Sequence, residues 1–331
     1  MPELRILLTS AGSLLGRGIL STLTGRRHNL WLLGGDLDPD SVGARSCDEA
    51  VALPPVEGAA FVEAVVKAVR TFGIDLVIPG RDPDLAALAG ADVPMAGCPS
   101  SLVDVLRDKW LSAQWCAHRD LPFVPTVATP TVGVPWSPPL IAKPRDGSGS
   151  LGVRVLVTDA HVQRACATPG LVLQPFLDPP DELVPDLGQG VPLFWEVECR
   201  AEYGVQALIG PDGRVGSWFC FVSEHRLGRN ESQARCDEPS LADFAARVVP
   251  RLAEAGFRGP VNLQVRRAGS GWQIIEINPR FSGGTSGRYL LGFDEVGWVL
   301  NEWFGAGTVP PGPECVADEV VWLPQEFGLW R

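Results

Sequence analysis

The segment Ile274–Arg280 constrains the fold of this chain most, because it reads Ile-Ile-Glu-Ile-Asn-Pro-Arg and alternates apolar with polar residues. Alternation with a period of two predicts a β-strand that has one face in a core and the other face free. Glu276 and Asn278 then share the polar face, and Ile275 and Ile277 fill the core behind it. A carboxylate beside a side-chain amide offers oxygen ligands of the kind that Mg²⁺ takes together with substrate phosphates.

A second strand pattern, Val261–Arg266, precedes this segment and predicts that the two form a hairpin. With a five-residue loop from Arg267 to Gly271, Asn262 lies opposite Glu276, and Gln264 is the diagonal neighbour. A four-residue loop instead turns Gln264 away, so the register decides whether its amide joins the carboxylate. An ordinary amphipathic hairpin with a polar face is the alternative interpretation.

Two lysines stand in settings that suit phosphate binding. Lys143 ends an apolar strand pattern and precedes the glycine-rich stretch Pro144–Gly152. Glycines let the backbone fold closely over an anion and point its amides at it, while a lysine on a strand supplies a fixed positive charge. Flexible glycine and serine loops that bind nothing share this pattern. Lys109, within Asp-Lys-Trp, offers another cation at the start of a helix, a position where solvated lysines are common.

The first 97 residues alternate strand and helix patterns, which is typical of a parallel sheet covered by helices. We expect strands at 4–9, 30–35, 50–53, 75–79 and 93–97, and helices at 58–72 and 82–89. The turn Ser10–Gly18, with Asp36 ending the next strand, is reminiscent of a dinucleotide-binding fingerprint. Its glycine spacing is not that of G-x-G-x-x-G.

Beyond residue 97 the pattern changes to hairpins with intervening helices. We expect helices at 101–107, 109–119 and 240–255, two more at the end, strand pairs at 140–143 with 153–157 and 202–209 with 214–222, and the hairpin described above. The proline-rich stretch 178–192 predicts a long loop and a candidate lid.

Composition excludes two classes of partner. The chain has 28 Lys and Arg residues against 39 Asp and Glu, for a net charge of −11, so we expect no binding to a nucleic-acid backbone. No apolar run approaches the ~18 residues of a membrane span, so we expect a cytoplasmic protein without a membrane partner. The eight cysteines show no zinc spacing, and the four histidines suggest no catalytic triad.

Together these segments resemble the ATP-grasp superfamily, in particular a single module similar to half of a carbamoyl phosphate synthetase large subunit. The resemblance covers most of the chain. It implies an α/β protein with a Rossmann-like parallel sheet at 1–97, followed by an ATP-grasp fold of two α+β subdomains. The subdomain at 98–177 would carry the lysines and the glycine-rich loop, and the one at 178–331 the metal-binding strands.

The resemblance also implies three sets of site residues. ATP would be held by the lysines, the loop, the hinge strand and an acid on the ribose: Lys109, Lys143, Gly147, Ser148, Gly149, Ser150, Gln174, Phe176 and Glu202, with Glu196 or Glu198 as alternatives to Glu202. Mg²⁺ or Mn²⁺ would be bound by Gln264, Glu276 and Asn278. Arg280 would stabilise the transferred phosphoryl group, with Arg226 or Arg229 as a second cation.

The activity implied is that of an ATP- and Mg-dependent carboxylate-amine ligase, which works through an acyl phosphate and releases ADP and phosphate. A small acid and a small amine would be its substrates, and a homodimer is common among similar proteins. One module rather than two favours a stand-alone ligase for an amino acid or small metabolite. The alternatives are an NAD(P)-dependent oxidoreductase that uses the N-terminal turn and Asp36, and a nucleotide-binding regulator without catalysis.

Overall fold

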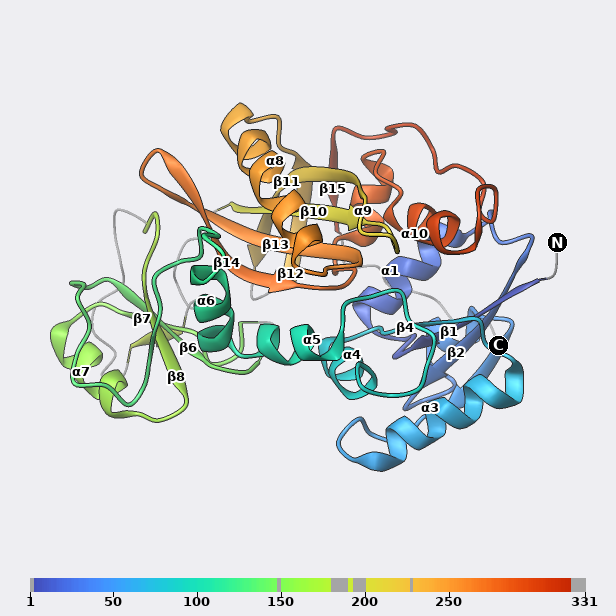
Figure 1. The fold of residues 1–331 in the computed structure, drawn as a ribbon, viewed down its shortest axis with the longest axis horizontal. Helices are drawn as coiled ribbons and strands as arrows, with labels where there is room; N and C mark the ends of the chain where they lie inside the picture. The colour runs from blue at the N-terminus through green and yellow to red at the C-terminus, as the bar shows by residue number, and fades with distance from the viewer. Residues whose placement is uncertain (1–2, 148–149, 180–189, 193–200, 227–228, 323–331) are drawn as a thin grey trace.

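The computed structural model describes residues 3–147, 150–179, 190–192, 201–226 and 229–322. These residues form three β-sheets. Figure 1 shows the sheets side by side along the long axis, with the largest sheet in the middle. This mixed α/β arrangement, with a parallel sheet first and antiparallel sheets after it, confirms the predicted fold class.

The first sheet is parallel and has the order β3-β2-β1-β4. Its strands are β1 (Leu4–Thr9), β2 (Leu30–Asp36), β3 (Glu49–Ala52) and β4 (Leu76–Ile78), and its helices are α1 (Leu14–Leu23), α2 (Val42–Arg45), α3 (Ala59–Phe72) and α4 (Asp82–Leu88). The predicted strand at 93–97 is wrong, since only an isolated bridge joins Met95 to Val77. Pro94 accepts a hydrogen bond from the Val77 amide but has no N–H to continue a ladder.

The second sheet has five strands in the order β5-β8-β6-β7-β9, and its pairs are antiparallel. Its strands are β5 (Val127–Ala128), β6 (Leu140–Pro144), β7 (Arg154–Leu156), β8 (Leu171–Pro175) and β9 (Val191–Pro192), and helix α7 (Asp159–Ala167) covers it. The pairing of β6 with β7 confirms the strands expected on either side of the glycine-rich loop.

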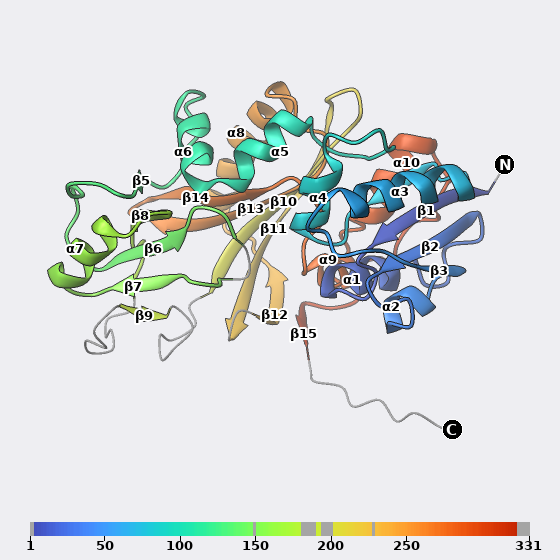
Figure 2. The same cartoon turned by 90° about the horizontal axis from the view of Figure 1, so that it is seen from below.

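The central sheet has the order β14-β13-β10-β11-β12-β15 and is antiparallel throughout. Its strands are β10 (Glu202–Ile209), β11 (Val215–Arg226), β12 (Arg229–Arg235), β13 (Gly259–Ala268), β14 (Gly271–Asn278) and β15 (Glu319–Val321). Three helices cover its apolar face: α5 (Ser100–Arg107), α6 (Lys109–Ala117) and α8 (Pro239–Glu254) (Figure 2). The opposite face carries polar side chains, among them Gln206 and Asn262.

Two short helices near the C-terminus return to the first sheet. Helix α9 (Thr285–Leu290) and helix α10 (Glu295–Phe304) both contact α1. Val296 and Leu300 join Ile19 and Leu23 in one buried cluster. The C-terminal part of the chain therefore contributes to the core around the first sheet, and the division at residues 97 and 177 stays a prediction.

The register of the β13–β14 hairpin differs from the expected one. Ala268 pairs with Gly271, so the loop has two residues rather than five, and Asn262 lies opposite Asn278 rather than Glu276. Gly269 has φ +59°, a conformation that tight two-residue turns require. The ladder shifts by one residue between Gln264 and Val265, which leaves Ile275 as a bulge.

The bulge changes which isoleucine fills the core. Ile274 is 0% exposed and belongs to the central cluster together with Ile277, whereas Ile275 lies outside that cluster and borders a cavity. The expectation that Ile275 packs in the core is therefore wrong, because a bulge inverts the alternation of side chains on one side of it. Gln264 lies directly opposite Glu276, closer than the diagonal position that was expected.

Candidate active site

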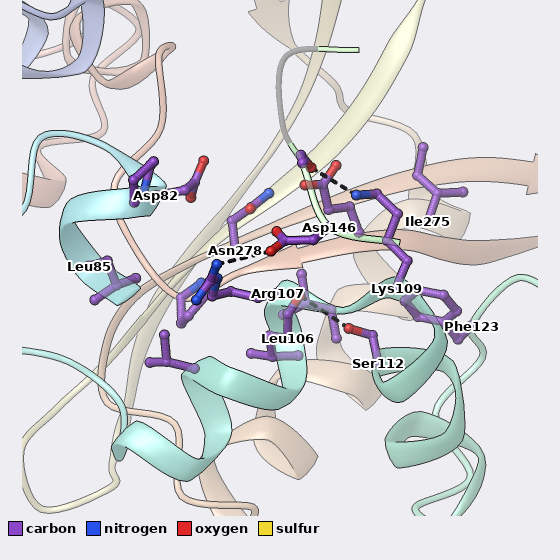
Figure 3. A pocket seen from close by; sticks show the side chains of 16 residues that line it. Asp82, Leu85, Leu106, Arg107, Lys109, Ser112, Phe123, Asp146, Ile275 and Asn278 are labelled. Carbon is purple, nitrogen blue, oxygen red and sulfur yellow. Dashed lines mark hydrogen bonds and ion pairs between the residues drawn. The ribbon is translucent and has the colours of Figure 1, made fainter. Parts of the chain in front are cut away.

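A cavity of about 110 Å³ lies between β14, the start of α4, helices α5 and α6, and the glycine-rich loop (Figure 3). Its polar lining comes from segments far apart in the sequence: Asp82, Arg107, Lys109, Ser112, Asp146, Gly147, Glu276 and Asn278. Pro83, Leu85, Val103, Leu106, Phe123, Ile275, Ile277 and Pro279 form the apolar remainder. The cavity is therefore lined by residues from both sets of segments that the sequence analysis predicted to bind a ligand, the Glu-Ile-Asn strand and the two lysine segments.

The three expected metal ligands lie on neighbouring positions of the polar sheet face. Gln264 is opposite Glu276, and Asn278 is opposite Asn262, whose Nδ2 donates to Gln206 Oε1 at 3.0 Å. Within the described residues no three His, Cys, Asp or Glu side chains lie close enough to hold a metal ion. A cation here would depend on one carboxylate, two amides and oxygens from a ligand, which is the donor set that suits Mg²⁺ beside phosphates.

Lys109 is held at the mouth of the glycine-rich loop. Asp108 caps α6 by accepting hydrogen bonds from the amides of Trp110 and Leu111, so the helix begins at the lysine. Lys109 is only 9% exposed, and its Nζ donates to the carbonyl oxygen of Gly147 at 2.8 Å (Figure 3). The first lysine segment and the loop therefore meet in space, as the resemblance implies.

Ion pairs that the sequence did not reveal fix the root of this loop. Arg145 Nε donates to Asp108 Oδ2 at 2.9 Å, and the Lys109 amide donates to the Arg145 carbonyl oxygen at 2.9 Å. Arg107 Nη2 and Asp146 Oδ2 form a further pair at 2.9 Å (Figure 3). Each of the two segments carries an Arg-Asp dipeptide, Arg107-Asp108 and Arg145-Asp146, and each arginine pairs with the aspartate of the other segment. The two dipeptides were the sequence signal for these pairs.

Three charged groups from separate segments lie close enough to affect pKa values at this site: Lys109, Lys143 and Glu276. Burial lowers the pKa of the Lys143 ammonium to about 8, opposed by the negative charge of Glu276 and reinforced by the positive charge of Lys109. Burial likewise raises the pKa of the Glu276 carboxyl, opposed by Lys109 and Lys143. Burial disfavours the charged form of each of these groups. A ligand with several negative charges would stabilise the charged lysines and is therefore favoured at this site.

Arg280 follows β14, and its guanidinium turns toward the first sheet. Its Nη2 donates to Asp82 Oδ2 at 2.7 Å, and its Nε donates to the other carboxylate oxygen of Asp82. The sequence reasoning missed Asp82, although an acid directly after a strand of a parallel sheet stands where ligands commonly bind. The expected phosphoryl-stabilising arginine is thus ion-paired in this structure.

Glu202 begins β10 on the polar sheet face, close to two basic side chains. Its Oε2 lies 3.8 Å from Arg266 Nη2 and 4.0 Å from His225 Nδ1. Glu202 remains the predicted ribose ligand. The alternatives Glu196 and Glu198 lie outside the described residues, as do Ser148 and Gly149 of the loop and the side chains of Arg226 and Arg229.

The predicted hinge residues lie at the end of β8. Gln174 is 2% exposed, and its Nε2 donates to Thr126 Oγ1 at 3.0 Å, so this side chain is engaged inside the protein. Phe176 packs against the cluster of Ile141, Val153 and Val155. Recognition of an adenine at this hinge would rest on backbone groups, as the resemblance implies.

Backbone amides of the N-terminal turn and of the start of α1 are hydrogen-bonded to side chains of the protein. The Gly12 amide donates to Asp36 Oδ2 at 2.7 Å, and the Ser13 side chain accepts from the Gly16 amide. A Cβ at Gly43 would stand 1.9 Å from the Ala11 carbonyl oxygen, so α2 packs directly on the turn. The groups that a dinucleotide would use are engaged by the protein, which disfavours the oxidoreductase alternative.

A parallel sheet is followed by a lysine-bearing sheet and a polar-faced central sheet, with the cavity at their junction, which is the arrangement that the resemblance to the ATP-grasp superfamily implies. Residues 200–320 match the model of a family described as "ATP-grasp in the biosynthetic pathway with Ter operon". This match confirms the resemblance that the motifs predicted. No curated protein sequence matches the chain.

Solved structures share the fold at low sequence identity. The N5-carboxyaminoimidazole synthetase of Staphylococcus aureus in complex with ADP is 13% identical, with a TM-score of 0.69 over 93% of this chain and 80% of that chain. An L-amino acid ligase of Bacillus licheniformis is 18% identical, with a TM-score of 0.66 over 91% and 74%. Rhizobium etli pyruvate carboxylase is 16% identical, with a TM-score of 0.66, and matches over 93% of this chain but only 29% of its own length.

Among the residues that the structure describes, no helix combines the length and the apolar character needed to cross a membrane.

Proposed function

We propose that this protein is an ATP- and Mg-dependent carboxylate-amine ligase that acts through an acyl phosphate and releases ADP and phosphate. One observation carries the proposal: Lys109 and Lys143, from separate segments, share the electrostatic neighbourhood of Glu276 beside the glycine-rich loop. Buried cations around a metal-type carboxylate are the equipment of phosphoryl transfer, in which catalysis is mostly positioning and charge stabilisation.

Groups in the cavity and beside it have the following parts in this proposal. Lys109 and Lys143 neutralise phosphate oxygens, and Gln264, Glu276 and Asn278 hold the divalent cation. The backbone around Gly147, which has φ +136°, lies over the phosphates in a conformation open to glycine alone. ATP supplies the phosphoryl group that activates the carboxylate, and Mg²⁺ or Mn²⁺ neutralises the charge on its oxygens. Arg280 stabilises the phosphoryl group in transfer.

The substrates belong to the same proposal. We infer a small acid and a small amine, because the similar structures include a ligase of L-amino acids and a synthetase of a small carboxyamino compound. The proposal further includes a cytoplasmic location and a homodimeric state. The biotin carboxylase domain of a similar carboxylase from Hydrogenobacter thermophilus is described as a dimer with MgADP.

Titration calorimetry tests the nucleotide site first, with ATP, with and without Mg²⁺, and with NADPH. We expect ATP binding that depends on Mg²⁺ in the wild type and is lost in Glu276→Ala, with no response to NADPH. Glu302→Gln is a matched control, since it removes a half-buried acid that pairs with Arg214 at 2.8 Å and does not line the cavity. NADPH binding without ATP binding would contradict the proposal.

A screen of acids and amines for Mg-dependent ADP release then separates a ligase from a silent regulator. A ligase releases ADP only when both substrates are present, and Lys143→Ala slows that release. Nucleotide binding without ADP release under any acid and amine pair would favour the regulator.

A further inference from the structure

The guanidinium of Arg280 has little donor capacity left for a ligand. Nε and Nη2, which form one edge of the group, both donate to the Asp82 carboxylate. Nη1 donates to the Phe281 carbonyl oxygen at 2.8 Å, and Nη2 also lies 3.4 Å from Asn278 Oδ1. An arginine grips a phosphate or carboxylate best through two parallel N–H bonds from one edge. Arg280 cannot present the Nε edge while Asp82 occupies it.

Asp82 reaches this position from a distant part of the chain. It begins α4, 198 residues before Arg280 in sequence, and it lines the same cavity as Glu276 and Asn278. The neighbouring cation, Arg81, pairs with Asp84 at 3.2 Å rather than with Asp82. The Asp82 carboxylate is therefore directed at Arg280, on the side where the proposed metal and phosphates lie.

The pair is also open enough to exchange partners. The Arg280 side chain is 16% exposed and the Asp82 side chain is 32% exposed, so neither charge is sealed in the core. Ion pairs at such partly exposed sites contribute modestly to stability and can be displaced by a stronger competitor. A phosphoryl group carries more negative charge than one carboxylate, and it offers three oxygens to the guanidinium.

We infer that Asp82 sets the affinity of the site for a γ-phosphate: its carboxylate competes with that phosphate for Arg280, so the arginine has to exchange partners when the phosphoryl group binds. The inference rests on the proposed function, in which Arg280 meets the transferred phosphoryl group. Removing the Asp82 carboxylate leaves the arginine charge uncompensated and its Nε edge free. The affinity for a nucleotide that carries a γ-phosphate then rises, while the affinity for ADP stays the same.

The test compares the Kd of Mg-ADP with that of the Mg complex of AMP-PNP, a non-hydrolysable ATP analogue, by titration calorimetry. We expect the ratio of the two Kd values to rise about fivefold in Asp82→Asn, the factor that ~1 kcal/mol corresponds to. Arg280→Gln lowers the ratio, and the double variant behaves like Arg280→Gln alone because the competition needs the arginine. Glu302→Gln leaves both affinities unchanged.

The outcomes separate this inference from the proposed function. An unchanged or lower ratio in Asp82→Asn overturns the inference while wild-type nucleotide binding stands, and so does a rise that persists in the double variant. If the wild type binds neither nucleotide, the proposed function fails and this inference falls with it. Thermal unfolding checks that each variant is folded, and Asp82→Ser provides a second removal of the carboxylate if Asp82→Asn does not fold.

Discussion

The chain contains two glycine-rich segments, Ser10–Gly18 after β1 and Pro144–Gly152 after β6, and they have opposite surroundings. The first loop is the turn Ser10–Ser13 with the start of α1, and the second loop is Pro144–Gly152. In the first loop the Gly12 amide is bound by Asp36, and no lysine lies within it. The second loop has Lys143 at its start and the Lys109 ammonium on its Gly147 carbonyl oxygen. One loop is satisfied by an acid of the protein itself, and the other is bordered by cations.

The glycines serve different purposes in the two loops. A Cβ at Gly16, in the first turn of α1, would stand 2.7 Å from the carbonyl oxygens of Ser10 and Ala11, so the helix needs glycine to pack closely on the turn before it. A Cβ at Gly147 would meet, among the described residues, one Pro144 carbon at 4.0 Å, so this position needs glycine for its positive φ rather than for space. Glycine content alone therefore does not define a phosphate site; the charges around the loop do.

Loss of a lysine at the second loop has the largest expected effect. In Lys143→Met, ADP release with a proven substrate pair slows about 100-fold, since one charge-stabilising donor commonly contributes ~3 kcal/mol to the transition state. Lys67→Met, at an exposed position on α3, is the matched control and leaves the rate unchanged. Equal rates for Lys143→Met and wild type would remove the distinction between the loops.

A methyl group on α2 that points at the first loop should lower stability rather than nucleotide affinity. Gly43→Ala places a Cβ against the Ala11 carbonyl oxygen, and such overpacking costs about 1–3 kcal/mol in the free energy of unfolding. Urea denaturation measures the loss, and the affinity for Mg-ATP stays within about twofold of wild type once the variant is folded. Gly90→Ala, with no atom within 4 Å of the new Cβ, should change neither quantity.

The pKa of Lys143, lowered to about 8, makes the second loop sensitive to pH. The ammonium is charged below pH 8 and loses its proton above it, so the affinity for Mg-ATP falls as the pH rises, by at most about tenfold per pH unit. Lys143→Met should show no inflection near pH 8. An identical pH profile in wild type and Lys143→Met would assign the inflection to another group.

The same shift acts on stability with a definite sign. The unfolded chain keeps the Lys143 proton up to the ordinary value of 10.5, whereas the folded chain releases it near 8. Burial of the charged amine therefore costs stability in full below pH 8, and this cost fades between pH 8 and 10.5. Lys143→Met should be more stable than wild type at pH 7 by a margin that narrows over that window, as urea denaturation at several pH values can show.

The smallest effect concerns the acid that closes the first loop. Asp36→Asn weakens the hydrogen bonds that the carboxylate accepts from the amides of Gly12 and Asp38, which costs about 1 kcal/mol in the free energy of unfolding. Mg-ATP affinity should not change. NADPH binding to the wild type that disappears in Asp36→Asn would break the comparison and revive the oxidoreductase alternative.

Local patterns predicted most of the elements but not their exceptions. Strand β12 was missed because every residue of Arg229–Arg235 except Ala234 is polar. Its pairing with β11 and β15 is what makes it a strand, and Gln233 within it is 1% exposed. Helix α7 was missed as well. The predicted register of the hairpin was wrong because the loop has two residues and a bulge at Ile275 shifts the ladder. Both features depend on how the two strands pair, which the pattern of a single strand does not reveal.

The site residues also fall into those that local patterns predict and those that depend on tertiary contacts. Glu276, Asn278, Lys109 and Lys143 could be singled out from strand alternation, glycine spacing and resemblance, because each lies in a pattern a few residues long. Asp82 could not be paired with Arg280 in that way. Their contact depends on how the first sheet docks beside the central sheet, and 198 residues separate them.

Local periodicity and short motifs were enough to predict the resemblance to the ATP-grasp superfamily, together with the two strands and two lysines that carry the proposed chemistry. By contrast, the folded structure was needed to show that Asp36 binds the Gly12 amide, that Lys109 meets Gly147, and that Asp82 binds Arg280. The physical reason is that hydrogen bonds and ion pairs act within a few ångströms. Which charges come that close is settled by packing among segments that are remote in sequence.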